Sequence, residues 1–267
     1  MSDEVYTHGH HESVLRSHRW RTAENSAAFL LGRLSATSRV LDVGCGPGTI
    51  TADLARRVPL GEVVGLDRSA VVIEAARAEH RVGNLSWCVG DVYDLGFDDA
   101  TFDVVFCHQV LQHLARPVEA IGEMRRVLKP GGVLGARDAD YGGFVWAPND
   151  PALDRWNALY HHLARLNGAE PDAGRRLPGW VRAAGLVELE VSSSTWTYAS
   201  VAERHWWGGL WAERVTRSDL ADQLLAHGLC DESELESLAE AFRRWAASPD
   251  GVFVVPHVEV VARREAS

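Results

Sequence analysis

The sequence predicts a doubly wound α/β fold with a mostly parallel sheet, and two observations support this. Between residues 39 and 138, short apolar runs of strand length alternate with segments of helix length, the order that builds a parallel sheet covered by helices. The unusual glycines and acidic residues follow these apolar runs, and such sheets bind ligands at the carboxyl ends of their strands. A chain of 267 residues, 46% of them hydrophobic, can bury the required core.

Five strands and three helices are expected in the alternating region. The strands are predicted at 39–44, 62–67, 85–91, 102–109 and 131–138, and the helices at 51–58, 69–80 and 115–132. Ser69 is the expected N-cap of the second helix. The third helix has apolar residues at 118, 121, 124, 127 and 128 and ends at a Pro-Gly-Gly sequence.

The remaining segments predict additions to one domain and not a second domain. Residues 1–38 form a polar arm followed by a helix over 23–34, and this arm is expected to cover the site. After a loop at 138–151, the pattern predicts a helix at 153–166, a helix and then a strand within 177–191, helices over 199–248 and a final strand at 252–264. We therefore expect one domain over 39–267, with insertions covering the substrate at about 141–175 and 195–250.

Charge and composition exclude several classes of function. The net charge is -10, from 27 Lys and Arg against 37 Asp and Glu, which disfavours binding to nucleic acid or to an anionic membrane. No apolar run approaches 18 residues, and the polar N-terminus does not resemble a signal peptide. The four cysteines form no Cys-x-x-Cys pair, so free thiols and a cytoplasmic location are expected.

The strongest local signal is the glycine-rich stretch LDVGCGPGTI at 41–50. A strand delivers Asp42 to its carboxyl end, and Gly44, Gly46 and Gly48 then allow a tight turn close to a ligand. A dinucleotide site wants G-x-G-x-x-G, whose third glycine would fall at Thr49, so an NAD oxidoreductase is disfavoured. A carboxylate at Asp42 would repel a diphosphate and attract a cationic amine.

Two further strand ends complete the predicted ligand site. Asp67 ends the second strand, where a carboxylate can accept hydrogen bonds from both ribose hydroxyls. Gly90, Asp91 and Val92 end the third strand, where the acid can bind an exocyclic amine and Val92 can cover an adenine face. The three acids fit an adenosine joined to an amino acid better than they fit NAD.

The sequence resembles the class I S-adenosylmethionine-dependent methyltransferases of the ubiquinone/menaquinone methyltransferase-like group. The resemblance rests on VLDVGCGPGT, VVGLDRS, VGDVYDLGFDDATFDVVFCHQVLQHL and EMRRVLKPGG, which run in the family's order between Arg39 and Asp138. It implies a Rossmann-like methyltransferase fold with seven strands, the last antiparallel, and helical lid additions at both ends of the chain. The antiparallel strand would be VFVVPHVEVVARR.

The resemblance also implies S-adenosyl-L-methionine as the cofactor. Asp42 and the loop from Gly44 to Gly48, with Cys45 in it, would lie by the methionine, and Asp67 with the following Arg68 would lie at the ribose. The stretch Gly90–Val92 would lie at the adenine. His108 and Gln109, just past the fourth strand, would face the methionine and the methyl group.

A catalytic base is needed only if the acceptor must lose a proton, since the sulfonium methyl is already activated. The predicted catalytic residues are His108, His113 and Tyr6, and further candidates are His10, His11, Tyr141 and His205. His108 comes first because it follows a strand end beside the ligand, although a cofactor or structural contact explains it equally well. For His113 a structural role at the start of a helix is favoured. No metal site is expected in the HGHH arm, because no cysteine pair supplies further ligands.

The predicted activity is methyl transfer to a small apolar or aromatic molecule, in secondary metabolism or quinone-like biosynthesis. Eight of the ten tryptophans lie beyond residue 140; most are expected in the core, but the neighbours Trp206 and Trp207 favour an aromatic pocket. Two alternatives stay open, a cofactor-binding module without methyl transfer and an enzyme of this fold that also promotes cyclisation. The acceptor, the methylated atom and a homo-oligomeric state also stay open.

Overall fold

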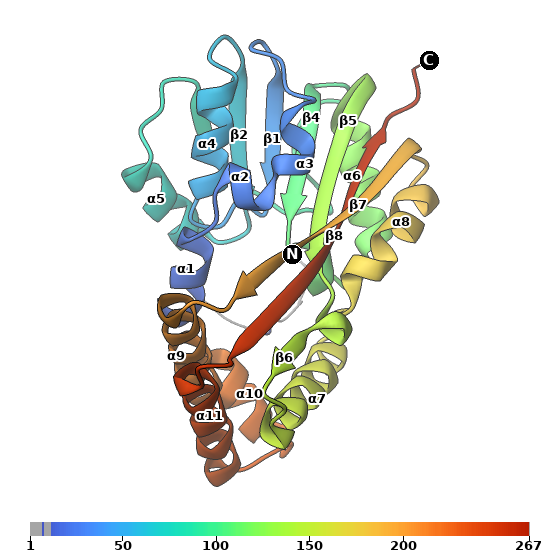
Figure 1. Cartoon of the computed structure of the whole chain (residues 1–267). Coiled ribbons are helices and arrows are strands. Elements are labelled where there is room, and N and C mark those ends of the chain that lie inside the picture. The colour runs from blue at the N-terminus through green and yellow to red at the C-terminus, as the bar shows by residue number, and fades with distance from the viewer. Residues whose placement is uncertain (1–6, 8–11, 267) are drawn as a thin grey trace.

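The computed structural model describes residue 7 and residues 12–266 of the chain. Its centre is one eight-stranded sheet in the order β3-β2-β1-β4-β5-β8-β6, with β7 paired to β8 as well (Figure 1). The strands are β1 Arg39–Val43, β2 Glu62–Asp67, β3 Leu85–Val89, β4 Phe102–His108, β5 Leu128–Ala139, β6 Val145–Ala147, β7 Val187–Tyr198 and β8 Val252–Arg263.

The first five strands are mutually parallel, and β8 runs antiparallel to both β5 and β7. The antiparallel final strand is therefore confirmed. The eighth strand, beyond the seven that the resemblance implies, is the short β6, which pairs with the beginning of β8 through Val145 and Val254. The carboxyl ends of β1, β2, β3 and β4 consequently meet at one edge of the sheet, as the glycine and acid pattern requires.

Both faces of the sheet are covered by helices, because successive residues of each buried strand point to opposite faces. On one face, α2 (Ala23–Ser26), α3 (Ala28–Leu31) and α4 (Thr49–Arg57) bury side chains such as Leu30 and Leu54 against Val104. On the other face, α6 (Pro117–Val127) and α8 (Ala173–Ala183) bury Met124 and Val181 beside Val105. Helix α5 (Ala70–Glu79) packs on β2 and β3.

Several helix boundaries test the sequence predictions directly. Ser69 is the N-cap of α5, and its side chain accepts a hydrogen bond from the Val72 N–H, so that prediction is confirmed. The single helix expected over 23–34 is wrong, because it is divided into α2 and α3 at Ala27, whose φ of -133° is not helical. Thr22 and Asn25 form a capping box that favours starting a separate short helix.

A third core lies beyond the carboxyl edge of the sheet, in the lower half of Figure 1. It is built by α7 (Pro151–Leu166), α9 (Val201–Arg217), α10 (Asp219–Ala226) and α11 (Glu232–Ala247), together with the lower ends of β7 and β8. Trp156, Trp211 and Phe242 are fully buried there in close ring contacts. The long helical prediction over 199–248 thus becomes three helices around an aromatic core.

The N-terminal segment is tied to these added helices. Helix α1 (Glu12–Arg19) packs against α9, where Arg16 forms an ion pair with Glu213 at 2.6 Å. Thr7 is buried and its hydroxyl accepts a hydrogen bond from the Asn167 amide at 3.1 Å. Among the described residues, no helix combines the length and the apolarity needed to cross a bilayer.

Candidate active site

A cleft of about 550 Å³ opens at the carboxyl ends of β1, β2, β3 and β4, and its size is typical of small-molecule and cofactor sites. Eleven of the twelve predicted cofactor residues line it, namely Asp42, Gly44, Cys45, Gly46, Asp67, Arg68, Gly90, Asp91, Val92, His108 and Gln109. Gly48 is the exception: it is the N-cap of α4 and does not line the cleft, although its neighbours Pro47 and Thr49 do.

The glycine loop has a geometry that only glycine adopts without strain. Gly44, Gly46 and Gly48 have φ values of +70°, +53° and +81°, in the left-handed region. A Cβ atom on Gly44 would lie 2.4 Å from Val110, and one on Gly48 would lie 2.2 Å from Trp87. The N–H groups of Gly44 and Cys45 donate to the Leu66 carbonyl at 2.7 and 3.0 Å, which fixes the loop to β2.

Asp42 is a buried carboxyl group on the wall of this cleft, near the end of β1. It is only 3% exposed and accepts a hydrogen bond from the Thr51 hydroxyl at 2.7 Å. Burial, with a smaller contribution from the negative charge of Asp67, raises the pKa of Asp42 to about 7, although the Thr51 hydrogen bond lowers it. A bound cationic group would stabilise the charged form of this carboxyl, so the site suits an amino-acid amine.

Asp67 and Asp91 stand at the ends of β2 and β3. The Asp67 carboxylate accepts hydrogen bonds from the N–H groups of Gly46 and Ser69, both at 3.0 Å, and Asp91 accepts one from the Tyr93 N–H. Each carboxylate oxygen can accept more than one hydrogen bond. Asp67 can therefore hold the glycine loop and bind ribose hydroxyls together.

His108 and Gln109 lie where β4 ends, between the cleft and a buried polar network. Gln109 has a φ of +53°, an uncommon conformation for a residue other than glycine, and its N–H donates to the Arg137 carbonyl. The Arg21 guanidinium, which follows α1, donates to the Gln109 side-chain oxygen at 2.7 Å. Burial, followed by the charges of Arg21 and Arg137, lowers the pKa of His108 well below its ordinary value.

His113 lies at the end of a short 3-10 helix, η1 (Leu111–His113), and lines the cleft. Burial, with a further contribution from the charge of Arg21, lowers the pKa of His113 to about 3. The Gln112 amide nitrogen lies 2.9 Å from Nε2 of His113. An amide NH2 group can only donate, so Nε2 of His113 is the acceptor. Such an imidazole is a weak base at neutral pH.

The other base candidates fall in different places. Tyr6, His10 and His11 lie outside the described residues, so their predicted roles stay predictions. His205 is exposed on α9 and does not line the cleft. Tyr141 is buried and does not line the cleft either. In the described part of the chain, no three His, Cys, Asp or Glu side chains are grouped to hold a metal ion.

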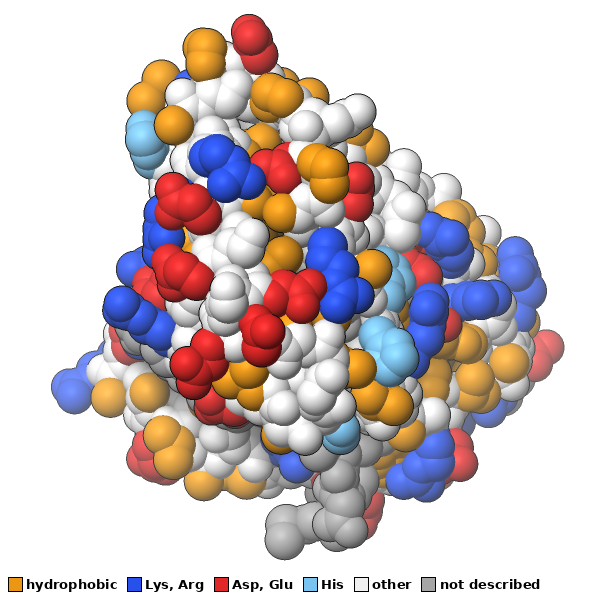
Figure 2. All heavy atoms as spheres, turned by 90° about the horizontal axis from the view of Figure 1, so that it is seen from below, with side chains coloured by type: hydrophobic (Ala, Val, Ile, Leu, Met, Phe, Trp, Pro, Cys, Tyr) orange, Lys and Arg blue, Asp and Glu red, His pale blue; other side chains and the backbone are white. Residues whose placement is uncertain are grey.

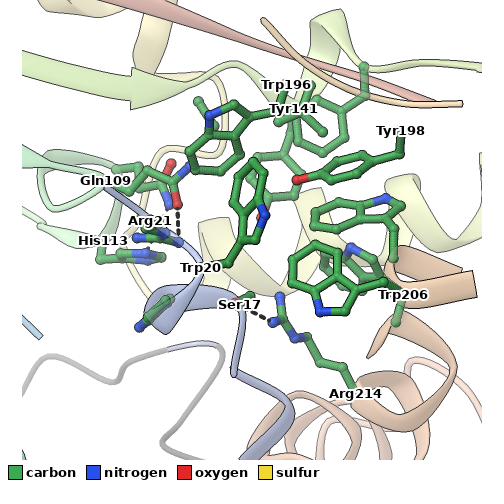
Figure 3. A pocket seen from close by; sticks show the side chains of 17 residues that line it. Ser17, Trp20, Arg21, Gln109, His113, Tyr141, Trp196, Tyr198, Trp206 and Arg214 are labelled. Carbon is green, nitrogen blue, oxygen red and sulfur yellow. Dashed lines mark hydrogen bonds between the residues drawn. The ribbon is translucent and has the colours of Figure 1, made fainter. Parts of the chain in front are cut away.

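A second, smaller cavity adjoins the cleft, and we call it the aromatic chamber (Figure 3). Its free volume is about 40 Å³, and its walls include Tyr141, Trp196, Tyr198, Trp206 and Trp207. The chamber and the cleft share four lining residues, which are His18, Arg21, Gln109 and His113. A molecule in the chamber would thus border the part of the cleft lined by His18, Arg21, Gln109 and His113.

The aromatic chamber contains buried polar atoms that lack hydrogen-bond partners. Among the described residues these atoms include the Tyr198 hydroxyl, the Trp207 indole N–H and the Gln112 side-chain oxygen. All three side chains are less than 10% exposed, at 2%, 6% and 3%. Buried polar groups are normally paired, so these atoms favour a ligand that supplies the missing partners.

Sequence reasoning missed Trp20 and Arg21, which enter the site from the N-terminal segment. Figure 3 shows the Trp20 ring standing between Trp196, Tyr198 and Trp206 inside the chamber. Nothing in the local pattern around residues 20 and 21 distinguishes them from a polar arm.

Seen from below, acidic and basic side chains are interspersed around the molecule, without an extended basic patch on this face (Figure 2).

The comparisons with known proteins agree with this geometry. Residues 41–136 match a family model described as a methyltransferase domain. The chain is 37% identical to an uncharacterized methyltransferase of Schizosaccharomyces pombe, over 97% of this chain and 96% of the relative. It is 30% identical to a probable methyltransferase of Aspergillus luteorubrus, over 96% of both chains. The chain belongs to the class I S-adenosylmethionine-dependent methyltransferase family.

A solved structure shows the shared fold. Phosphoethanolamine N-methyltransferase 2 of Haemonchus contortus, in complex with phosphomonomethylethanolamine and S-adenosylhomocysteine, superposes with a TM-score of 0.55 at 16% identity. The alignment covers 88% of this chain and 51% of that chain. S-adenosylmethionine is the cofactor of this family, and the cleft fits it: the glycine loop permits close approach, and the buried Asp42 carboxyl suits a cation.

Proposed function

We propose that this methyltransferase acts on a small apolar or aromatic acceptor that binds in the aromatic chamber. The observation that carries the proposal is the wall of four residues that the chamber shares with the cofactor cleft. An aromatic enclosure with a few convergent polar atoms is typical of small-molecule sites. The acceptor would lie against the end of the cleft where His108 and Gln109 stand.

The residues of the site would act mainly by positioning and by excluding water. S-adenosylmethionine supplies an activated methyl group, so orientation and desolvation can provide much of the catalysis. The cleft residues Asp42, Asp67 and Asp91 would hold the cofactor, with the ribose at Asp67. Because burial makes His108 and His113 weak bases, we expect the acceptor to enter the reaction without a strong protein base.

The setting that we propose is secondary metabolism or quinone-like biosynthesis, as the resemblance to the ubiquinone/menaquinone group implies. A cytoplasmic location also belongs to the proposal, and Cys45, Cys88, Cys107 and Cys230 are free thiols as expected there. A homo-oligomeric state stays a prediction.

The test measures S-adenosylhomocysteine release from a panel of acceptors matched in size. Aromatic members should be methylated faster than aliphatic members with the same functional group. Trp206→Ala should slow the transfer without changing cofactor affinity, because Trp206 lines only the chamber. Trp180→Ala is the matched control, since Trp180 is also partly buried but lines neither cavity.

The outcomes separate the competing functions. Cofactor binding without S-adenosylhomocysteine release from any acceptor would favour the module without methyl transfer. Ring closure of an added substrate without S-adenosylhomocysteine release would favour cyclisation. Equal rates for aromatic and aliphatic acceptors would contradict the assignment of the chamber.

A further inference from the structure

We infer that Trp20 and Arg21 select the acceptor. The Trp20 indole occupies the place that the planar aromatic ring of the acceptor takes when it binds. Arg21 then binds an acidic oxygen on the acceptor ring, from a phenol or a carboxyl group. This inference rests on the proposed function, because it names the substrate class of the same chamber. Three observations carry it, namely the position of the Trp20 ring, the charge of the chamber walls and the location of Arg21.

The Trp20 ring lies within the aromatic chamber as a bound aromatic molecule would. Its centroid is 5.3 Å from Trp196 in an edge-to-face contact, 5.6 Å from Trp206 and 6.1 Å from Tyr198. These are favourable separations for aromatic pairs. The ring leaves a free volume of only about 40 Å³, so an acceptor ring needs the space that Trp20 fills.

Trp20 is also placed to leave the chamber. Its side chain is 40% exposed, whereas Tyr198 and Trp207 on the walls are 2% and 6% exposed. The residue follows the end of α1, which α9 holds through the Arg16–Glu213 ion pair and through Arg214, which donates to the Ser17 hydroxyl at 3.0 Å. A rotation of Trp20 can therefore vacate the chamber while α1 stays docked.

The walls of the chamber are positively charged. Arg21 and Arg214 line it, and among the described residues no acidic side chain does. The Tyr198 hydroxyl and the Trp207 N–H add two donors that have no partner within the part of the chain that the structure describes. Donors and guanidinium groups stabilise anionic or carbonyl oxygens and disfavour an ammonium group. The Gln112 oxygen is one acceptor against these several donors, so an acidic oxygen fits this chamber better than an amine does.

Arg21 stands at the junction of the two cavities, because it lines both the chamber and the cofactor cleft. Its guanidinium lies beside Gln109 and 3.5 Å from the His108 ring. An oxygen held by Arg21 would thus face the methionine end of the cleft while its ring fills the chamber. The positive charge favours the ionised oxygen, which removes the need for a base among the weakly basic histidines.

The resulting step balances without a further reactant. The proton of the phenol or carboxylic acid goes to solvent before transfer. An electron pair of the ionised oxygen forms the new bond to the methyl carbon while the sulfur–methyl bond breaks, and its electron pair stays on sulfur. The products are the methyl ether or methyl ester and S-adenosylhomocysteine.

The experiment uses rings of the size that the chamber already holds. Indole, 5-hydroxyindole, indole-5-carboxylate and 5-aminoindole are titrated by calorimetry into the protein saturated with S-adenosylhomocysteine. Trp20→Ala should bind indole at least about tenfold more tightly than the wild type, because apolar cavities left by removed rings bind small aromatic molecules. Equal affinity of the two proteins for indole, or no binding to Trp20→Ala, would overturn the placement of the ring.

The oxygen preference is read in the same series. In Trp20→Ala, 5-hydroxyindole or indole-5-carboxylate should bind about tenfold or more tightly than 5-aminoindole, the range for a charged hydrogen bond. The comparison of these two oxygen compounds separates a phenolic from a carboxylic acceptor. The further change Arg21→Gln should abolish the preference, and Arg56→Gln should keep it, since Arg56 is exposed on α4 and lines neither cavity. A preference for the amine, or none, would overturn the role of Arg21.

A measurement on the wild type guards against a variant that fails to fold. Amide hydrogen exchange of residues 20–22 should become faster when the preferred indole binds, since Trp20 must leave the chamber while α1 stays docked. Unchanged or slower exchange of these residues would contradict the displacement. Failure of the proposed function is distinguishable, because it appears as absent S-adenosylhomocysteine binding or absent methyl transfer. If only this inference fails, S-adenosylhomocysteine binding and methyl transfer remain. What disappears is the tighter binding of indole to Trp20→Ala and the preference for the oxygen compounds over 5-aminoindole.

Discussion

The guanidinium of Arg137 donates a hydrogen bond of 2.7 Å to Nε2 of His108. A guanidinium has no acceptor, so Nε2 must present its lone pair and the proton of the neutral imidazole lies on Nδ1. Arg137 is itself buried at 1% exposure and paired with Glu259 at 3.1 Å. This pair therefore fixes the tautomer of His108 and uses the lone pair that a general base would need.

We expect His108 to position the cofactor and not to accept a proton. His108→Asn should lower S-adenosylmethionine affinity and kcat by similar factors, each about tenfold, the loss expected for a hydrogen bond to a charged ligand group. The pH dependence of kcat should keep its shape. Calorimetry and steady-state rates across pH check this, with His205→Asn as the control because His205 is exposed on α9 and lines neither cavity. A large fall in kcat at unchanged cofactor affinity would instead identify His108 as a base.

Asp67 should contribute to cofactor binding through the ribose. Asp67→Ala should weaken S-adenosylmethionine binding by about 1–3 kcal/mol, the range for losing charged hydrogen bonds to a buried partner. Part of this loss would come from the glycine loop, because Asp67 also accepts the Gly46 N–H. Calorimetry measures the affinity, and Asp99→Ala serves as the control because Asp99 is 70% exposed and lies outside the cleft. Unchanged affinity of Asp67→Ala would remove the ribose assignment.

The sheet and the cofactor cleft could be predicted because their signals are local. Each strand between residues 39 and 138 is a short apolar run, and each acidic residue follows its strand directly, so parallel strand order brings Asp42, Asp67 and Asp91 to one edge. The aromatic chamber could not be predicted in this way. Trp20 meets Trp196 across more than 170 residues of sequence, and no periodicity reports such a contact.

The polar residues buried beside His108, which are Arg137, His257 and Glu259, were missed for a different reason. Arg137, His257 and Glu259 lie inside strands β5 and β8 that are buried on both faces. Their signal was available, because charged residues inside an apolar strand need partners in the fold. The sequence does not show that Arg137 pairs with Glu259 and with His108 of the neighbouring strand β4, or that His257 pairs with Gln109.

Asp138 should make the protein less stable as pH rises. Burial raises the pKa of Asp138 from 3.8 to about 8, so the folded state binds a proton that the unfolded state loses above about pH 4. The stability from this group is complete below the unfolded pKa and is lost as pH rises toward 8. Asp138→Asn should therefore show a smaller fall in Tm between pH 5 and pH 8 than the wild type does, by about a few degrees. Exposed Asp154→Asn should follow the wild type, and identical profiles for all three proteins would contradict the buried proton.

The Tyr198 hydroxyl should stabilise a bound acceptor, although it lowers the free energy of unfolding of the protein without a ligand. Its hydroxyl is buried without a hydrogen-bond partner among the described residues, while its ring stacks on Trp207 at 4.3 Å. Removing an unpaired buried hydroxyl should leave the free energy of unfolding unchanged or raise it by up to about 2 kcal/mol. Tyr198→Phe should therefore keep or increase Tm while it raises the KM of a polar aromatic acceptor.

Tyr160→Phe is the matched control, since Tyr160 is equally buried at 2% exposure but forms a hydrogen bond with Tyr141. This control variant should lower the unfolding free energy by about 1 kcal/mol. A Tyr198→Phe protein that loses stability without a change in acceptor KM would show that the hydroxyl serves the fold and not the ligand.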